Sequence, residues 1–301
     1  MTTISCCKSF VSATLVPLVY IACIRVCSWG CFIRDDKKTI WRRFFGACVA
    51  CLILGYSASY WKNENLTYAQ FFGFRASGLL PALVLPLQLT AFLYLGPIVL
   101  SIVDGCWRLD WESLRPDCIT LRNLVLVSDL TLHDVDRPIG WSAGKCTRSY
   151  SFQAPLTEEF AFRCCILPML QNCLSAKTSL FIVPLFFSMG HFHHVIEQRR
   201  LGYSWKTSIN ICAFQAFYTY IFGLYASFLY LRTDHFVAAV LCHSFCNRMG
   251  LPECDTVYGL QRSKRCLVCF SYLFGFLIWL FLFIPTTEPR IYQNFFAPDL
   301  F

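Results

Sequence analysis

The stretch Cys266–Thr287, CLVCFSYLFGFLIWLFLFIPTT, contains 22 residues and no charged side chain. At 1.5 Å per residue, a helix of this length extends about 33 Å. The hydrocarbon core of a bilayer is about 30 Å thick, so the stretch predicts a membrane-spanning helix. Three basic residues, Arg262, Lys264 and Arg265, precede it. Basic residues favour the cytosolic side, where we expect this end of the helix.

Several other parts of the chain resemble this stretch. Four further long uncharged runs predict spanning helices: Ser9–Ile24, Phe44–Trp61, Ala76–Val103 and Ser208–Leu231. Three runs of 12 or 13 residues are too short to span alone: Cys164–Ala176, Thr178–Gly190 and Phe236–Asn247. These shorter runs either extend into spans with their neighbours or form half-buried helices that line a cavity. The pattern predicts an all-α polytopic membrane protein with about seven or eight helices.

The composition of the 301 residues supports this fold class. Hydrophobic residues make up 56% and charged residues 15%, with a mean hydropathy of +0.50. Soluble proteins carry about 25% charged residues, so a soluble domain and a disordered chain are excluded. The apolar residues form continuous runs rather than alternating, which disfavours a transmembrane β-barrel. The net charge of +8 comes from basic residues at the edges of apolar runs, so we expect contact with lipid headgroups and no nucleic-acid partner.

The organisation along the chain is that of a single membrane domain, residues 1–301. We expect Ser9–Ile24 to belong to an uncleaved first helix, followed by the basic cytosolic loop Arg34–Arg43. The segment Leu124–Gln153 is polar and predicts a loop or an insertion. Most of the 19 cysteines lie inside apolar runs, where cysteine behaves as a small apolar residue rather than a metal or redox site.

The first chemically active cluster is Glu158-Glu159-Phe-Ala-Phe-Arg163. Thr157 predicts a helix N-cap directly before the two acids. Glu159 and Arg163 are four residues apart, so they can pair on one helical face. Glu158 points about 100° away from that face and is available for another role. Ionisable groups in such apolar surroundings are costly and are usually functional.

Two further clusters combine histidine with other polar groups. The segment Gly190-His191-Phe-His193-His194 ends a long apolar run, and His191 and His194 share a helical face. In His243-Ser-Phe-Cys-Asn247, the spacing of four directs both side chains toward one point. A carboxylate, neutral imidazoles and an amide suit general-base activation of water together with an oxyanion site.

Other catalytic signatures are missing from the sequence. It contains no His-Glu-x-x-His of a zinc protease, no Gly-x-Ser-x-Gly elbow and no phosphate-binding Gly-Lys-Ser/Thr loop. Three alternatives to a protease stay open from the residues alone. They are a non-proteolytic membrane scaffold of the same fold, a transporter or proton relay that uses the acids and histidines, and a zinc enzyme of another type.

The three clusters together resemble the type II CAAX prenyl endopeptidases, the Ras-converting proteases. That superfamily carries a Glu-Glu-x-x-x-Arg motif, a Phe-x-x-x-His motif and a His-x-x-x-Asn/Asp motif. They appear here in order as Glu158–Arg163, Phe187–His191 and His243–Asn247. The similarity covers roughly Ala154–Pro252, and we therefore expect residues 154–252 to form the catalytic core.

The resemblance implies an activity and a location. The enzyme would release the last three residues of a prenylated Cys-a-a-X protein, such as a Ras-type small GTPase carrying farnesyl or geranylgeranyl. It would act in the endoplasmic reticulum membrane as a multi-pass protein. The implied fold is about eight transmembrane or membrane-embedded helices around an intramembrane catalytic cavity that is open to the membrane.

The resemblance also assigns roles to seven residues. Glu158 would be the general base, and His191 would help to bind and activate the water. His243 and Asn247 would stabilise the oxyanion. The supporting residues would be Glu159, Arg163 and His194. No metal ion and no cofactor are expected in this reaction scheme.

One part of the chain departs from the family pattern. Leu121-Arg122-Asn123 is separated from Ala154 by thirty residues, whereas only a few residues separate the two in close relatives. We interpret Leu124–Gln153 as a lineage insertion or as the product of a mis-spliced gene model. Sequencing the transcript across these codons would distinguish the two.

Overall fold

The computed structural model describes residues 3–30, 37–103 and 153–294. Every regular element in these ranges is a helix, as the sequence predicts. The predicted insertion Leu124–Gln153 lies outside the described residues except at its last position. The elements are α1 (Thr3–Cys27), α2 (Lys37–Ser59), α3 (Tyr68–Phe71), α4 (Leu79–Leu93), α5 (Leu95–Val103), α7 (Gln153–Glu159), η2 (Phe160–Cys165), α8 (Ile166–Gln171), α9 (Ala176–Gly190), η3 (His191–His193), α10 (His194–Arg200), α11 (Trp205–Thr233), α12 (Phe236–Met249), α13 (Cys254–Gly259), α14 (Arg262–Thr286) and η4 (Pro289–Tyr292).

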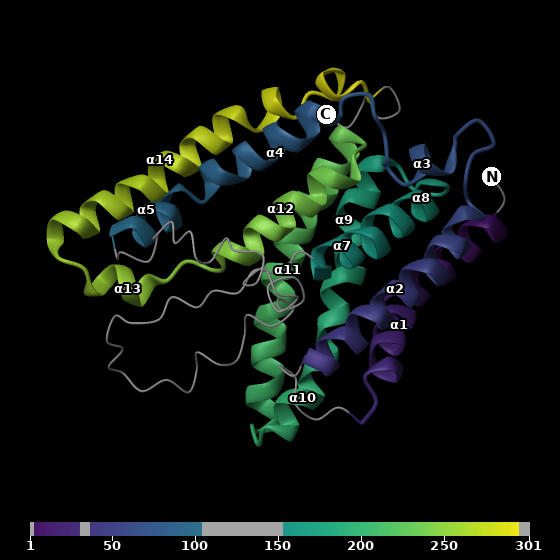
Figure 1. Cartoon of the computed structure of the whole chain (residues 1–301), viewed down its shortest axis with the longest axis horizontal. Coiled ribbons are helices and arrows are strands. Elements are labelled where there is room, and N and C mark those ends of the chain that lie inside the picture. The colour runs from purple at the N-terminus through teal and green to yellow at the C-terminus, as the bar shows by residue number, and fades with distance from the viewer. Residues whose placement is uncertain (1–2, 31–36, 104–152, 295–301) are drawn as a thin grey trace.

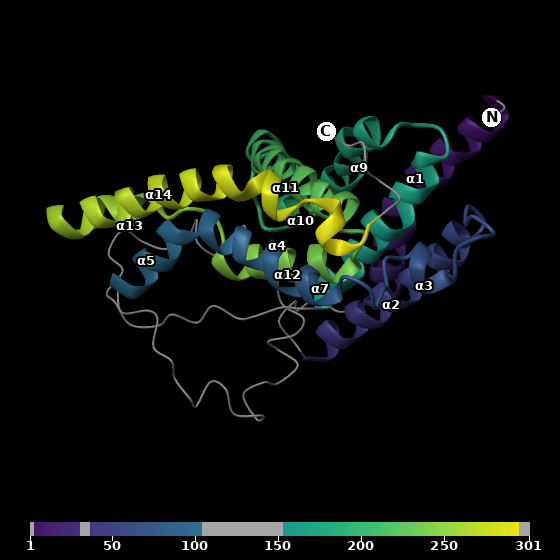
Figure 2. The same ribbon diagram turned by 90° about the horizontal axis from the view of Figure 1, so that it is seen from above.

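The helices form three groups that pack side by side (Figure 1). Helices α1 and α2 pack together at one end of the molecule, and α14 packs along α4 and α5 at the other end. Helices α7, α9, α11 and α12 lie between these two groups (Figures 1 and 2). The middle group therefore contacts protein on both sides, and it carries the polar clusters found in the sequence.

Five helices in the described part of the chain are long and apolar enough to cross a membrane: Cys6–Cys27, Lys38–Ser59, Ala176–Arg200, Trp205–Thr233 and Arg262–Thr286. Four of them overlap runs that the sequence predicts to span. The fifth joins α9, η3 and α10, so the short run Thr178–Gly190 does extend into a span. The chain is thus a multi-pass membrane protein, and the expected count of about eight helices is not confirmed.

The predicted span Ala76–Val103 is broken. It forms α4 and α5, and the pair is bent by 66°. If this bent pair counts as one span, the number of candidate spans is six. The break falls at Tyr94, three residues before Pro97. Proline has no N–H and clashes with the preceding turn, which explains why a straight helix does not continue here.

The short helices of the middle group are not spans. Helix α12 has 14 residues, which corresponds to about 21 Å, and α7 has seven. Their flanking residues are nevertheless buried by neighbouring helices, and the fully buried core includes Cys164, Cys165 and Cys242. Of the two possibilities for the short runs, Phe236–Asn247 in α12 follows the second, in which protein surrounds a half-buried helix.

Close contacts between helices require small residues at particular points. At Gly275 in α14, an added Cβ would lie 2.3 Å from the carbonyl oxygen of Phe92 and 2.7 Å from Cβ of Leu95. At Gly259 in α13, an added Cβ would meet nothing within 4 Å. These two helical glycines are thus a matched pair for testing the packing of α14 on α4 and α5.

We predict that Gly275→Ala lowers the thermal stability of the protein in detergent. Overpacking against backbone typically costs about 1–3 kcal/mol because the helices must move apart. Thermal unfolding followed by circular dichroism would measure the effect, with Gly259→Ala as the control that leaves the midpoint unchanged. Equal midpoints for the two variants would contradict the observed packing.

Candidate active site

The two adjacent acids Glu158 and Glu159 point in different directions, as their helical positions predict. Glu159 is completely buried and accepts a bond from Nη1 of Arg163 at 3.0 Å, which confirms the predicted pairing across four residues. The Glu158 side chain is 12% exposed and lines a cavity. Glu159 is therefore paired in the protein interior, whereas Glu158 faces the cavity.

The helix that carries both acids has an irregular turn. Residues Phe160–Cys165 form a π-helix between α7 and α8. Such turns contain one extra residue and occur frequently at functional sites. The predicted N-cap at Thr157 is wrong, because α7 begins earlier and Thr157 lies inside it. Its hydroxyl instead lies 2.8 Å from the Tyr20 hydroxyl, which connects α7 to α1.

Arg163 is held in place by three different kinds of contact. It pairs with Glu159, and its Nη2 lies 3.5 Å from the carbonyl oxygen of Gly223 in α11. Its guanidinium carbon lies 4.5 Å from the centre of the Phe187 ring, a cation–π contact. An added Cβ at Gly223 would lie 3.3 Å from Nη2 of Arg163 and 2.8 Å from Pro184. Gly223, which the sequence did not single out, allows this approach.

His243 reaches both acids from α12. Its Nδ1 lies 2.7 Å from Oε1 of Glu159, and its Nε2 lies 3.8 Å from Oε2 of Glu158. A carboxylate paired with arginine can only accept, so the Nδ1–H of His243 donates to Glu159. This contact fixes the orientation of the imidazole and places Nε2 on the Glu158 side.

His191 is oriented by its own helix. Its Nδ1 lies 3.0 Å from the carbonyl oxygen of Phe187, one turn earlier. A carbonyl oxygen can only accept, so Nδ1 carries the proton and Nε2 of the neutral ring is an acceptor. The ring also makes an edge contact with Phe187, at 5.0 Å between centroids. His191 is thus positioned as a hydrogen-bond acceptor.

All four residues predicted to be catalytic line one cavity of about 680 Å³: Glu158, His191, His243 and Asn247. This volume lies within the range of about 300–1,000 Å³ that is usual for ligand pockets. The supporting residues Glu159 and Arg163 lie behind the cavity wall, completely buried. His194 does not line the cavity and pairs with Glu197 at 2.8 Å instead.

The rest of the cavity wall is mainly aromatic. Helix α11 contributes Phe222 and Tyr225, and α14 contributes Phe276, Trp279 and Phe283. From the sequence alone, these residues are only parts of the long apolar runs. Their place at the cavity depends on how α11 and α14 pack, and no local motif indicates it.

The ionisation of Glu158 is also affected by its surroundings. Glu158 lies in α7, outside the candidate spans. Burial, the largest effect, raises the pKa of its carboxyl, and the charge of His243 opposes that shift. A carboxyl with a raised pKa is a better general base near neutral pH.

Comparisons with known proteins show which family the chain belongs to. The family model "Type II CAAX prenyl endopeptidase Rce1-like" matches residues 147–249. The human protein CAAX prenyl protease 2 is 34% identical, over 87% of this chain and 76% of its own length. The chain belongs to the type II CAAX prenyl endopeptidases. Relatives from other kingdoms are also similar to this chain.

Two of these relatives extend the comparison to a fungus and a plant. A probable CAAX prenyl protease 2 of Schizosaccharomyces pombe is 40% identical, over 68% of this chain and 67% of its own length. CAAX prenyl protease 2 of Arabidopsis thaliana is 32% identical, over 74% of this chain and 69% of its own length. No solved structure gives a significant match. The stretch matched by the endopeptidase family model overlaps the predicted core, residues 154–252.

We predict that breaking the buried pair and neutralising it have different effects on stability. Arg163→Met alone removes the arginine partner of the buried Glu159 charge, a change that typically costs about 3–5 kcal/mol. Adding Glu159→Gln removes that charge and keeps an acceptor for His243, so the double variant should recover part of the loss. Thermal unfolding of both variants in detergent measures this; a double variant less stable than Arg163→Met would contradict the pairing.

Proposed function

We propose that this membrane protease removes the C-terminal aaX tripeptide from farnesylated or geranylgeranylated Cys-a-a-X proteins. The observation that carries the proposal is the single cavity that joins Glu158, two imidazoles and an amide to an aromatic wall. The polar groups suit peptide hydrolysis, and the aromatic side chains suit an isoprenoid chain. Both are needed for a substrate that is part peptide and part lipid.

The first step is the activation of water. Glu158 takes a proton from a water molecule whose other hydrogen is accepted by Nε2 of His191. The oxygen then attacks the carbonyl carbon of the lipidated cysteine. The proton passes from Glu158 to the departing amine as the peptide bond breaks. The products are a new carboxyl group on the prenylated cysteine and a free tripeptide, so water is the only co-reactant.

The second requirement is a site for the oxyanion. In this proposal, Asn247 donates from its amide and His243 donates from Nε2. Since Nδ1 of His243 already donates to Glu159, this role requires the doubly protonated ring. The charges then balance, with Glu158 and Glu159 opposite Arg163 and His243. Glu159 and Arg163 thus act as positioning residues for His243, and His194 supports the segment that carries His191.

The wider assignments complete the proposal. We place the protein in the endoplasmic reticulum membrane, with Ras-type small GTPases among its substrates and lipid as its surroundings. Residues 1–301 form one membrane domain, and residues 154–252 form its catalytic core. The segment Leu124–Gln153 is an insertion before that core. The human and plant relatives are named CAAX prenyl proteases, which supports the substrate class.

We predict that Glu158→Ala abolishes cleavage of a farnesylated Cys-a-a-X peptide by membranes that contain the protein. Loss of a general base typically lowers the rate by about 10²–10⁴-fold. The control is Asp255→Ala, which removes an exposed carboxylate of α13. Cleavage by the unmodified protein and by Glu158→Ala at equal rates would exclude Glu158 as the base. No cleavage by either, even after deletion of residues 124–153, would favour a scaffold.

We predict that Asn247→Ala lowers kcat by about 10²–10³-fold with little change in KM, because an oxyanion donor acts in the transition state. The control is Asn65→Ala, which removes an exposed amide that does not line the cavity. Steady-state kinetics with the farnesylated peptide give both constants. A rise in KM at unchanged kcat would instead assign Asn247 to substrate binding.

A further inference from the structure

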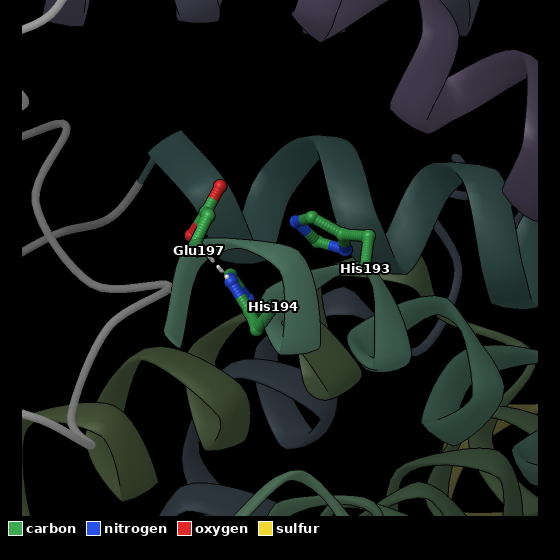
Figure 3. Close-up of side chains that lie close together, drawn as sticks. All are labelled: His193, His194 and Glu197. Atoms are coloured by element: carbon green, nitrogen blue, oxygen red, sulfur yellow. Dashed lines mark hydrogen bonds and ion pairs between the residues drawn. The ribbon is translucent and has the colours of Figure 1, made fainter. Parts of the chain in front are cut away.

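A second polar cluster lies at the junction of α9 and α10, outside the catalytic cavity. His193, His194 and Glu197 each offer one ligand atom, and these atoms lie within 4.8 Å of one another. Figure 3 shows the two imidazoles and the carboxylate next to each other on consecutive turns. None of the three residues lines the cavity. Among the described residues, this is the one group of histidine, cysteine or acidic side chains with the spacing of metal ligands.

The hydrogen bonds around the cluster orient its ligand atoms. Nδ1 of His193 lies 2.6 Å from the carbonyl oxygen of Gly190 and donates to it, which leaves Nε2 as the ligand atom. This contact is typical of metal-binding histidines, whose second nitrogen commonly donates to a backbone carbonyl. The two imidazole centroids are 4.0 Å apart. The hydrogen bond to Gly190 and the contact between the two rings therefore fix the position of the His193 side chain.

Each oxygen of the Glu197 carboxylate has a partner. Its Oε1 pairs with Nη2 of Arg25 at 2.5 Å, and its Oε2 lies 2.8 Å from Nδ1 of His194. The His194 side chain is 3% exposed. The proton between His194 and Oε2 occupies the position that a metal ion would take.

We propose that His193, His194 and Glu197 form a binding site for a divalent transition-metal ion of the zinc class. The ligands would be Nε2 of His193, Nδ1 of His194 and Oε2 of Glu197, with water in the fourth position. Two nitrogens and one carboxylate oxygen are a ligand set that zinc accepts. Donors on a tetrahedral zinc lie about 3.3 Å apart, so the His194–Glu197 contact must open by about half an ångström.

Binding of the ion at Nδ1 of His194 would move the proton of that neutral ring to Nε2, as the ion takes the place of the proton beside Oε2 of Glu197. The ion would also connect η3 to α10, and η3 begins at His191. The site would thus stabilise the segment that positions a cavity residue, without contributing a metal to the reaction itself.

Arg25 makes a distinctive test possible. Its positive charge faces the same carboxylate and opposes a second cation there. Glu197→Gln and Arg25→Gln both break the Arg25–Glu197 ion pair, yet they should change metal affinity in opposite directions. A purely structural ion pair predicts no metal binding in either variant.

The experiment is a titration of the purified full chain in detergent with Co²⁺, followed by its visible absorption, and with Zn²⁺ by calorimetry. The protein should carry an affinity tag without histidine, and its accessible thiols should be alkylated first, because cysteines also bind these metals. We expect one ion per chain. We expect binding about tenfold or more weaker in Glu197→Gln and in His193→Ala, and tighter binding in Arg25→Gln.

The control Asp255→Asn should bind as the unmodified chain does, and circular dichroism should confirm that each variant is folded. Absence of stoichiometric binding to the unmodified chain would overturn the proposal. So would binding that Glu197→Gln leaves unchanged. Weaker binding in Arg25→Gln would also overturn it, since that result would mean that the ion pair, rather than a metal, holds the cluster together.

Discussion

The carboxylate of Glu159 is the group on which the rest of the site depends. It is completely buried, and one oxygen accepts from both Arg163 and His243. A buried charge is tolerated only with such partners, because transfer from water into an apolar interior is costly. The three residues come from η2, its preceding helix and α12. Their mutual requirement therefore determines how α12 packs against the helix that carries Glu158.

This constraint separates the two neighbouring acids. With Glu159 held inside by Arg163 and His243, the helical geometry turns Glu158 toward the cavity. The same contact leaves only Nε2 of His243 to face that cavity, so the imidazole has one defined function there. The buried pair is therefore better understood as a device for orientation than as a source of stability. This view agrees with the small net gain that buried ion pairs usually give.

The spacing of residues predicts local features of this site, and the family resemblance predicts which of the distant motifs contribute to it. The individual contacts between distant segments could not be predicted. The spacing of four between Glu159 and Arg163, and between His243 and Asn247, is enough to place each pair on one face. The bond from His243 to Glu159 joins residues 84 positions apart, and the pair Arg25–Glu197 joins residues 172 apart. The bend at Tyr94 and the π-helical turn at Phe160–Cys165 result from competition between packing and backbone hydrogen bonding, which apolar runs do not reveal.

The arrangement also explains why Glu158, His243 and Asn247 lie on short helices in a protein made mainly of long ones. A spanning helix such as α14 exposes much of its surface to lipid, where ionised groups are excluded. Helices α7 and α12 are surrounded by protein instead, so their polar residues can pair with one another. The aromatic side chains of α11 and α14 then form the boundary between this polar centre and the lipid. In the proposed function, a substrate that is partly lipid would lie along the long helices while its peptide bond meets the short ones.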